Sequence, residues 1–177
     1  MSYPFVQASH YTAGRNGKTP RMIVIHTMET PETVGRAHQV ADWFAGATAP
    51  QASAHYCVDN QFIYQSVKEA DTAWAVDDFD LNQQSISIEL AGAASQSIAN
   101  WHDVYSVAEM NHLVQLSKEI MGQYGIPAVH LTSAQILDGK SKGFAYHSDI
   151  TIAKKIAGGH TDPGVNFPLA EFLKALA

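Results

Sequence analysis

A short apolar run, Met22-Ile23-Val24-Ile25, restricts the folds open to this chain more than any other stretch. An unbroken run of mostly β-branched residues predicts a strand buried on both faces, and such strands belong to sheets that helices cover on both sides. His26 follows the run directly. Because open α/β sheets bind ligands at the carboxyl ends of their strands, His26 is either a ligand-binding residue or a histidine that caps the strand.

Residues 85–90 predict a second strand, with a different pattern. Ile86, Ile88 and Leu90 alternate with polar residues, so the apolar side chains face one side and Glu89 faces the other. A glutamate on a polar strand face is usually just solvated. If that face meets a metal ion, Glu89 becomes the candidate general base.

Helical and strand patterns alternate along the rest of the chain. One helix is predicted to begin at Thr30-Pro31-Glu32 and end at Gly46, and a longer one to begin at a capping box of Ser106 and Glu109 and end before Gly125. Strands are predicted at 53–58 and 62–67, a short helix at 133–137 and a last helix from 166 onward. The alternation predicts one α/β domain over residues 1–177, with a central mixed, mostly buried β-sheet flanked by helices and an N-terminal arm at 1–21.

Composition and charge exclude several classes of protein. The chain has 177 residues, 46% hydrophobic and 16% charged, which is enough for one well-buried domain. A net charge of −6 argues against a nucleic-acid partner, and no apolar run approaches the roughly 20 residues that span a bilayer. The single cysteine, Cys57, rules out an internal disulfide framework. Residues 1–18 lack the apolar core of a signal peptide, so we expect synthesis in the cytoplasm. We also expect the protein to be a monomer.

Two stretches late in the chain concentrate side chains that bind metals. Residues 146–149 contain His147, and residues 159–164 contain His160 and Asp162 among glycines and a proline. Because glycine is conformationally permissive and proline removes a backbone donor, this region is predicted to be a loop rather than a helix or strand. Loops with such side chains commonly carry function.

Together with His26, these side chains suit a catalytic metal site. Catalytic zinc takes three protein ligands of nitrogen or oxygen type and keeps a fourth position for water. His26, His147 and either His160 or Asp162 would supply three ligands. The spacing does not choose between the last two, because residues two apart on an extended segment face the same side.

Two other side-chain groups have alternative interpretations. His55 and Cys57 share one face of a predicted strand and could form a nucleophile pair, but Cys57 is more simply a small buried hydrophobic residue. Trp74 could be a platform for a sugar or peptide, although burial in the core is favoured for so large a side chain.

Five motifs in order carry a resemblance to a known family. They are Ile23-Val24-Ile25-His26-Thr27, Ser53-Ala54-His55-Tyr56, Ser87-Ile88-Glu89-Leu90-Ala91-Gly92, His147-Ser148-Asp149 and His160-Thr161-Asp162-Pro163-Gly164. Together they resemble the type 2 N-acetylmuramoyl-L-alanine amidases, which include phage lysozyme-amidases and peptidoglycan recognition proteins. The resemblance runs from Val6 to Leu173, and within the family the chain most resembles the amidase domains of actinobacterial phage endolysins.

The resemblance implies a set of site residues. His26, His147 and Asp162 would hold Zn²⁺ at the strand ends. Glu89 would activate water, and His160, at a position that is often lysine in the family, would donate to the developing oxyanion.

The resemblance also implies supporting roles for three further residues. His55 would orient a metal ligand, and Thr27 and Trp74 would lie close to the ligands or the substrate. Some members place a tyrosine at the position of Ala54 and use it instead of the glutamate, so this chain resembles the glutamate-using group.

Two features depart from the family pattern. Residues 152–158 lengthen the segment between His147 and Asp162, and Ala75 stands where many members have a histidine. The path of the lengthened loop and the manner of holding substrate are therefore open. Asp149 is interpreted as part of the local loop structure.

The implied reaction is hydrolysis of the amide between N-acetylmuramic acid and the L-alanine of the peptidoglycan stem peptide. As a phage or prophage endolysin domain, the protein would act on the bacterial cell wall after its release from the cytoplasm. Two alternatives remain: a module that binds peptidoglycan without cleaving it, and a zinc peptidase that acts on wall peptides.

Overall fold

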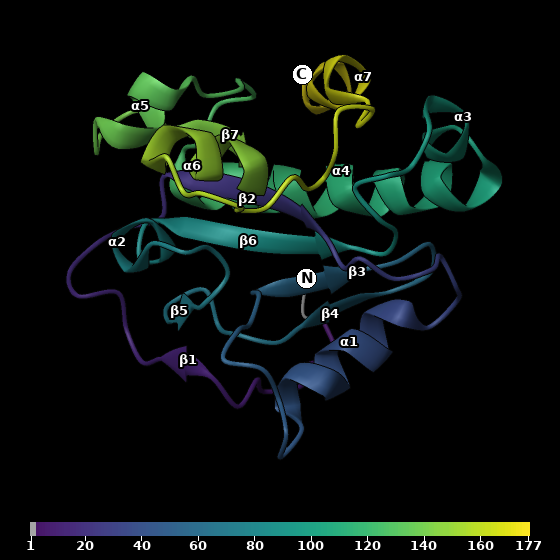
Figure 1. The fold of residues 1–177 in the computed structure, drawn as a ribbon, viewed down its shortest axis with the longest axis horizontal. Helices are drawn as coiled ribbons and strands as arrows, with labels where there is room; N and C mark the ends of the chain where they lie inside the picture. The colour runs from purple at the N-terminus through teal and green to yellow at the C-terminus, as the bar shows by residue number, and fades with distance from the viewer. Residues whose placement is uncertain (1–2) are drawn as a thin grey trace.

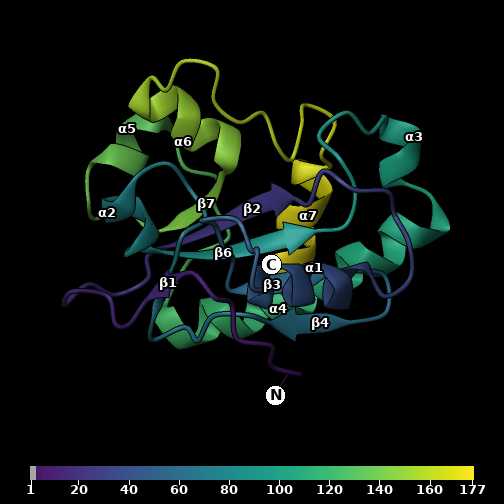
Figure 2. The same cartoon turned by 60° about the horizontal axis from the view of Figure 1, so that its bottom comes forward.

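The computed structural model describes residues 3–177, and at its centre lies a five-stranded sheet with the order β4-β3-β6-β2-β7. β6 (Ser85–Leu90), β2 (Met22–Thr27) and β7 (Gly143–Tyr146) are parallel neighbours. β3 (Tyr56–Val58) is parallel to β6, and β4 (Ile63–Gln65) is antiparallel to β3 at the sheet edge. In Figure 2 the arrows of β2 and β6 point the same way and that of β4 points the opposite way.

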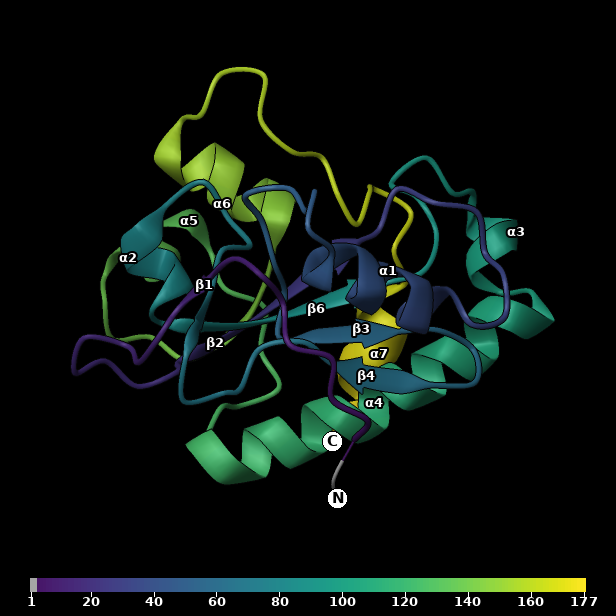
Figure 3. The same ribbon diagram turned by 90° about the horizontal axis from the view of Figure 1, so that it is seen from below.

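Helices cover both faces of this sheet. α4 (Val104–Tyr124) and α7 (Leu169–Leu176) lie on one face, and α1 (Arg36–Ala45) and α6 (His147–Lys154) lie on the other (Figure 1, Figure 3). All six residues of β2 are buried, as predicted for a strand covered on both sides. The predicted α/β fold with a mixed, helix-flanked sheet is confirmed.

Short elements complete the domain. β1 (Tyr11–Thr12), from the predicted N-terminal arm, pairs antiparallel with β5 (Thr72–Ala73), and three short helices are α2 (Phe79–Asn82), α3 (Ile98–Trp101) and α5 (Ser133–Leu137). The strands predicted at 53–58 and 62–67 form the shorter pair β3 and β4. Among residues 3–177, no helix has both the length and the apolar character needed to cross a bilayer.

The predicted helix start at Thr30-Pro31-Glu32 is wrong. α1 begins at Arg36, after Gly35 in the left-handed conformation with φ 81°. The carboxylate of Glu32 is committed elsewhere, because it accepts hydrogen bonds from the Ser106 hydroxyl at 2.5 Å and from the Gln96 amide at 2.9 Å. Residues 30–35 are therefore a loop tied to neighbouring segments, while the predicted helix end at Gly46 is confirmed.

The predicted capping box of Ser106 and Glu109 is also wrong. Asp103 is the N-cap of α4, because its side chain accepts a hydrogen bond from the Ser106 N–H. The Glu109 side chain instead crosses to the end of β6, where its Oε1 accepts a hydrogen bond from the Ala91 N–H at 2.7 Å. The predicted end of this helix at Gly125, in the left-handed conformation, is confirmed.

The stretch at 146–149, predicted to be a loop, is the junction between β7 and α6. β7 pairs with β2 along its whole length, and α6 begins at His147. Asp149 explains why a helix starts here, since its Oδ2 accepts a hydrogen bond from the Tyr146 N–H at 2.7 Å and contacts His130 Nε2 at 2.7 Å. Residues 152–154, thought to be part of an extra loop, are the last turn of this helix.

Glu109 gives the fold a testable pH dependence. The side chain is fully buried, and its Oε2 has no hydrogen-bond partner among the described residues. Burial raises the pKa of its carboxyl well above the usual range; the hydrogen bond from Ala91 opposes this shift, and the nearby Glu32 carboxylate adds to it. The folded chain therefore keeps a proton that the unfolded chain releases near pH 4.5, so the free energy of unfolding should fall as the pH rises above that value.

Urea unfolding between pH 5 and 8 checks this expectation. Glu109→Gln should make this fall smaller, because the amide does not titrate, while Glu89, whose pKa burial also raises, contributes equally to both proteins. Asp77→Asn, at an exposed position, should keep the wild-type slope. If the free energy of unfolding changed equally with pH in wild type and Glu109→Gln, this account of the buried carboxyl would be contradicted.

Candidate active site

The register of three parallel strands brings Glu89, His26 and His147 side by side. Glu89 on β6 lies directly opposite His26 on β2. Ile25 on β2 pairs with Tyr146 on β7, and His147 is the next residue, so it follows at the level of His26. Neighbouring strands are about 4.8 Å apart and paired residues share a face, so these side chains form one row at the carboxyl ends of the strands. His26 therefore lies at the edge of the sheet where open α/β folds bind their ligands.

Asp162 joins the two histidines in a buried cluster. His26 Nδ1 lies 3.1 Å from His147 Nδ1 and 3.4 Å from Asp162 Oδ2, and His147 Nδ1 lies 3.2 Å from Asp162 Oδ1. All three residues are at most 5% exposed. The Ser148 N–H donates to the backbone carbonyl of Asp162 at 3.1 Å, which fixes the loop against the first turn of α6. Of the two third-ligand candidates, the structure places Asp162 in this cluster.

The cluster has the geometry of a metal site. Two ligand atoms on a tetrahedral zinc ion, with bonds of about 2.0–2.1 Å, lie about 3.3–3.4 Å apart, which is close to the separations of 3.1–3.4 Å found here. Two imidazole nitrogens and a carboxylate oxygen converge where a cation would satisfy all of them. Three such ligands leave one tetrahedral position open, as catalytic zinc sites do.

Electrostatics favour the same interpretation. Burial lowers the pKa of His26 to about 4, so its imidazole is neutral, as a metal ligand must be. Burial alone would raise the pKa of Asp162, but hydrogen bonds from His147 and His26 outweigh it and hold that pKa well below the usual range. The cluster therefore presents a negative carboxylate beside neutral imidazole, an environment that attracts a cation.

Glu89 is a buried acid with an unused oxygen. Its Oε2 is shielded from solvent and has no hydrogen-bond partner in the described part of the chain. Burial raises the pKa of Glu89 well above its usual range, and the negative charges of Asp162 and Glu29 add to the effect. A cation bound at the neighbouring cluster would favour the ionised form, which is the form a general base needs.

Cys57 extends the same row on β3 but does not look reactive. It pairs with Glu89 and is fully buried. Burial raises the pKa of its thiol, and the Glu89 charge raises it further, so the thiolate is strongly disfavoured. The interpretation of Cys57 as a small buried hydrophobic residue is supported, and the nucleophile pair with His55 is not.

His160 and Thr27 lie around the cluster. The His160 ring stacks on His147 with ring centres 3.9 Å apart, and its Nδ1 is 3.5 Å from Asp162 Oδ1. Its side chain is 54% exposed, so it reaches both the cluster and the open cavity. The Thr27 N–H donates to Asp162 Oδ2 at 3.4 Å, and the Thr27 hydroxyl donates to Glu29 Oε1 at 2.7 Å.

His55 lies away from the metal ligands that it was expected to orient, whereas Trp74 lines the cavity. The fully buried ring of His55 accepts a hydrogen bond from the Ser87 N–H at Nδ1, and its Nε2 is 2.7 Å from an Arg15 nitrogen. The ring of His55 therefore contacts the buried guanidinium of Arg15 and does not contact His26, His147 or Asp162. Trp74 is half-buried on a cavity wall, where its Nε1 donates to Thr12, so the favoured interpretation as a core residue is wrong.

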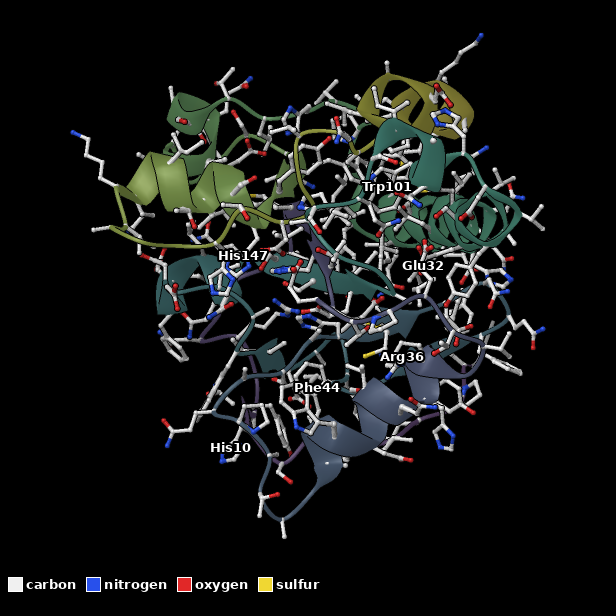
Figure 4. The ribbon with its side chains drawn as sticks, turned by 45° about the vertical axis from the view of Figure 1, so that its right-hand side comes forward. His10, Glu32, Arg36, Phe44, Trp101 and His147 are labelled. Atoms are coloured by element: carbon white, nitrogen blue, oxygen red, sulfur yellow. The ribbon has the colours of Figure 1, made fainter. Side chains whose placement is uncertain are left out.

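A cavity of about 600 Å³ opens beside the cluster, and His26, Glu89 and Asp162 line one part of it. Its lining also includes side chains of α1 that the sequence did not lead us to place at the site: Arg36, Gln39, Val40, Trp43 and Phe44. Figure 4 shows Arg36 and Phe44 on α1 and His147 at the start of α6, on separate elements. The spacing of these α1 residues marks one helical face and could have revealed the wall.

Comparisons with known proteins give one family match. A family model described as N-acetylmuramoyl-L-alanine amidase matches residues 15–165. A search of curated proteins finds no significant match.

Solved structures with the same fold are distant in sequence. The Staphylococcus aureus hydrolase AmiA in complex with its ligand is 18% identical, with a TM-score of 0.69 over 99% of this chain and 83% of that one. The N-acetylmuramoyl-L-alanine amidase LysC from Clostridium intestinale URNW is 18% identical, with a TM-score of 0.57 over 99% and 98%. A mutant endolysin from Bacillus subtilis is 16% identical, with a TM-score of 0.62 over 99% and 100%.

Metal analysis tests the assignment of ligands. After equilibrium dialysis against zinc, we expect one tightly bound ion per chain, and Asp162→Ala should lose it because only two imidazole ligands, and no carboxylate, remain in the cluster. His160→Ala should keep the ion, since the His160 side chain is half-exposed beside the cluster. His38→Ala, at an exposed position on α1, is the matched control. Loss of the ion in His160→Ala with retention in Asp162→Ala would reverse the assignment.

Proposed function

The chain belongs to the N-acetylmuramoyl-L-alanine amidase family, and we propose that it hydrolyses the amide between N-acetylmuramic acid and the L-alanine of the stem peptide, with zinc as its cofactor. The observation that carries this proposal is the row of Glu89, His26 and His147, completed by Asp162 and open to a cavity. The row therefore places a metal site and a general base next to each other at the cavity.

The proposed mechanism assigns separate tasks to the residues of the row. His26, His147 and Asp162 would hold the zinc ion, which when bound would acidify a water molecule and polarise the scissile carbonyl. Glu89 takes a proton from the water molecule while the water oxygen bonds to the carbonyl carbon. It then passes that proton to the alanine nitrogen as the carbon–nitrogen bond breaks.

The raised pKa of Glu89 suits both halves of this proton transfer. A carboxyl that burial pushes toward its protonated form returns a proton to the leaving amine more readily than an ordinary solvated one. His160, half-exposed beside the cluster, is placed to donate a hydrogen bond to the oxygen that becomes negative during attack. Trp74 contributes an aromatic wall on the substrate side of the cavity.

The biological role we propose is that of an endolysin catalytic domain of phage or prophage origin, formed by residues 1–177. The motifs that resemble actinobacterial phage amidase domains support this role, and so does the shared fold with an endolysin from Bacillus subtilis. We propose synthesis in the cytoplasm and action on the peptidoglycan of the cell wall after release.

Glu89→Gln tests the proposed base. Release of free alanine amino groups from purified peptidoglycan should fall by about 10²–10⁴-fold, because a positioned proton acceptor contributes about that much. Bound zinc, measured in the same sample, should stay at the wild-type level. Glu171→Gln, the same chemical change at an exposed position of α7, should leave the rate unchanged.

Mass analysis of the products separates the amidase from the two alternatives. Fragments with a free lactyl carboxylate and a free alanine amine support the amidase. Cleavage only between amino acids of the stem would indicate a peptidase, and binding without any product would indicate a recognition module. A fully active Glu89→Gln protein would contradict the role of Glu89.

A further inference from the structure

One face of α1 forms a wall of the cavity, and this wall has two chemically different ends. Arg36 and Gln39 lie toward the start of the helix, and Trp43 and Phe44 lie toward its end. With a rise of about 1.5 Å per residue, the cationic end and the aromatic end are separated by about 10 Å along the helix. A ligand lying along α1 would therefore meet a charged end and an apolar end (Figure 4).

Arg36 is a cation without an acidic partner. Among the described residues that line the cavity, it is the only lysine or arginine. It is half-buried, its Nε donates only to the Pro31 carbonyl at 3.3 Å, and no carboxylate of residues 3–177 forms an ion pair with it. Glu29, which shares the cavity lining, has its Oε1 engaged by the Thr27 hydroxyl and the Ala94 N–H.

An unpaired guanidinium is unexpected in this chain. Acidic residues outnumber lysine and arginine by 17 to 11, and other cations do find partners, as Lys18 does with Asp80 and Lys154 with Asp78. Among residues 3–177, no group accepts a hydrogen bond from the two terminal nitrogens of Arg36, so they are available to an anion in the cavity. The planar fork of arginine matches a carboxylate, which it binds through two parallel hydrogen bonds.

We infer that Arg36, assisted by Gln39 one turn along α1, binds a free carboxylate of the stem peptide and so selects substrates that carry one. This inference rests on the proposed function, which places the scissile amide at the metal cluster. The limb beyond L-alanine can supply the carboxylate: its second residue is a glutamate joined through its side chain, whose α-carboxylate is free in some cell walls and amidated in others. The aromatic end of α1 offers a carboxylate no comparable partner.

The size of the effect follows from the type of contact. A hydrogen bond to a charged group contributes more than a neutral one, and its loss corresponds to about a tenfold to hundredfold weaker affinity. The inference therefore concerns substrate choice and KM. Because Arg36 comes from α1 and is not part of the cluster of His26, His147 and Asp162, the turnover of a saturating substrate should change little.

The probes are N-acetylmuramoyl-L-alanyl-D-isoglutamate and its D-isoglutamine counterpart, each with the side-chain carboxyl capped as its methylamide. The α-carboxylate, free in one probe and amidated in the other, is then their only difference. Their binding is measured by calorimetry on zinc-loaded Glu89→Gln protein, and their hydrolysis on protein with Glu89 intact. We expect the free acid to bind about tenfold or more tightly than the amide. Adding Arg36→Gln should abolish this preference, and adding Arg36→Lys should retain part of it.

Lys174→Gln, which removes one exposed positive charge on α7, controls for net charge and should keep the full preference. Thermal unfolding of each variant confirms that it is folded. Equal binding of both probes to the protein with Arg36 intact, or an equal loss for both probes in Arg36→Gln, would overturn the inference. A carboxylate preference without any hydrolysis would overturn the amidase proposal but support the Arg36 subsite. Hydrolysis without a carboxylate preference would support the amidase proposal and overturn the Arg36 subsite.

Discussion

The parallel register of β6, β2 and β7 is the constraint on which the rest of the structure depends. It puts Glu89 opposite His26 and brings His147 to the same level. Successive side chains of a strand point to opposite faces, so a slip of one residue would turn His26 into the apolar layer under α4. The apolar residues of β2 and β6 on that side, such as Ile25 and Ile88, are fully buried and hold the register.

Charge in the row is balanced only when a cation is present. Asp162 and the Oε2 atom of Glu89 are shielded from water, and the charge of Asp162 helps to raise the pKa of Glu89. An unpaired buried carboxylate is costly, and bringing a second acid close increases the cost. A metal ion beside Asp162 would lower this cost and keep Glu89 ionised. The closeness of Asp162 and Glu89, which is unfavourable without a cation, therefore suits a site that activates water when a cation is bound.

Local patterns in the sequence predicted the strands better than the segments that complete the cavity. The pattern of residues 22–25 and the alternation of residues 85–90 were sufficient to place His26 and Glu89. The junction at His147 was misassigned because its helix start depends on Asp149, which pairs across space with His130. The wall of α1 was missed because tertiary hydrogen bonds, rather than helix propensity, keep the preceding residues 30–35 out of the helix. Spacing alone did not choose between Asp162 and His160, and the family resemblance implied Asp162; the path of their loop brings Asp162 against His26 and His147.

A crystal structure of the zinc-loaded protein, with anomalous diffraction measured at the zinc edge, tests the central claim most directly. The account requires one anomalous peak per chain, about 2.0–2.2 Å from His26 Nδ1, His147 Nδ1 and a carboxylate oxygen of Asp162, with the open side of the ion toward Glu89. A peak coordinated by His160 in place of Asp162, or one away from the row, would contradict it.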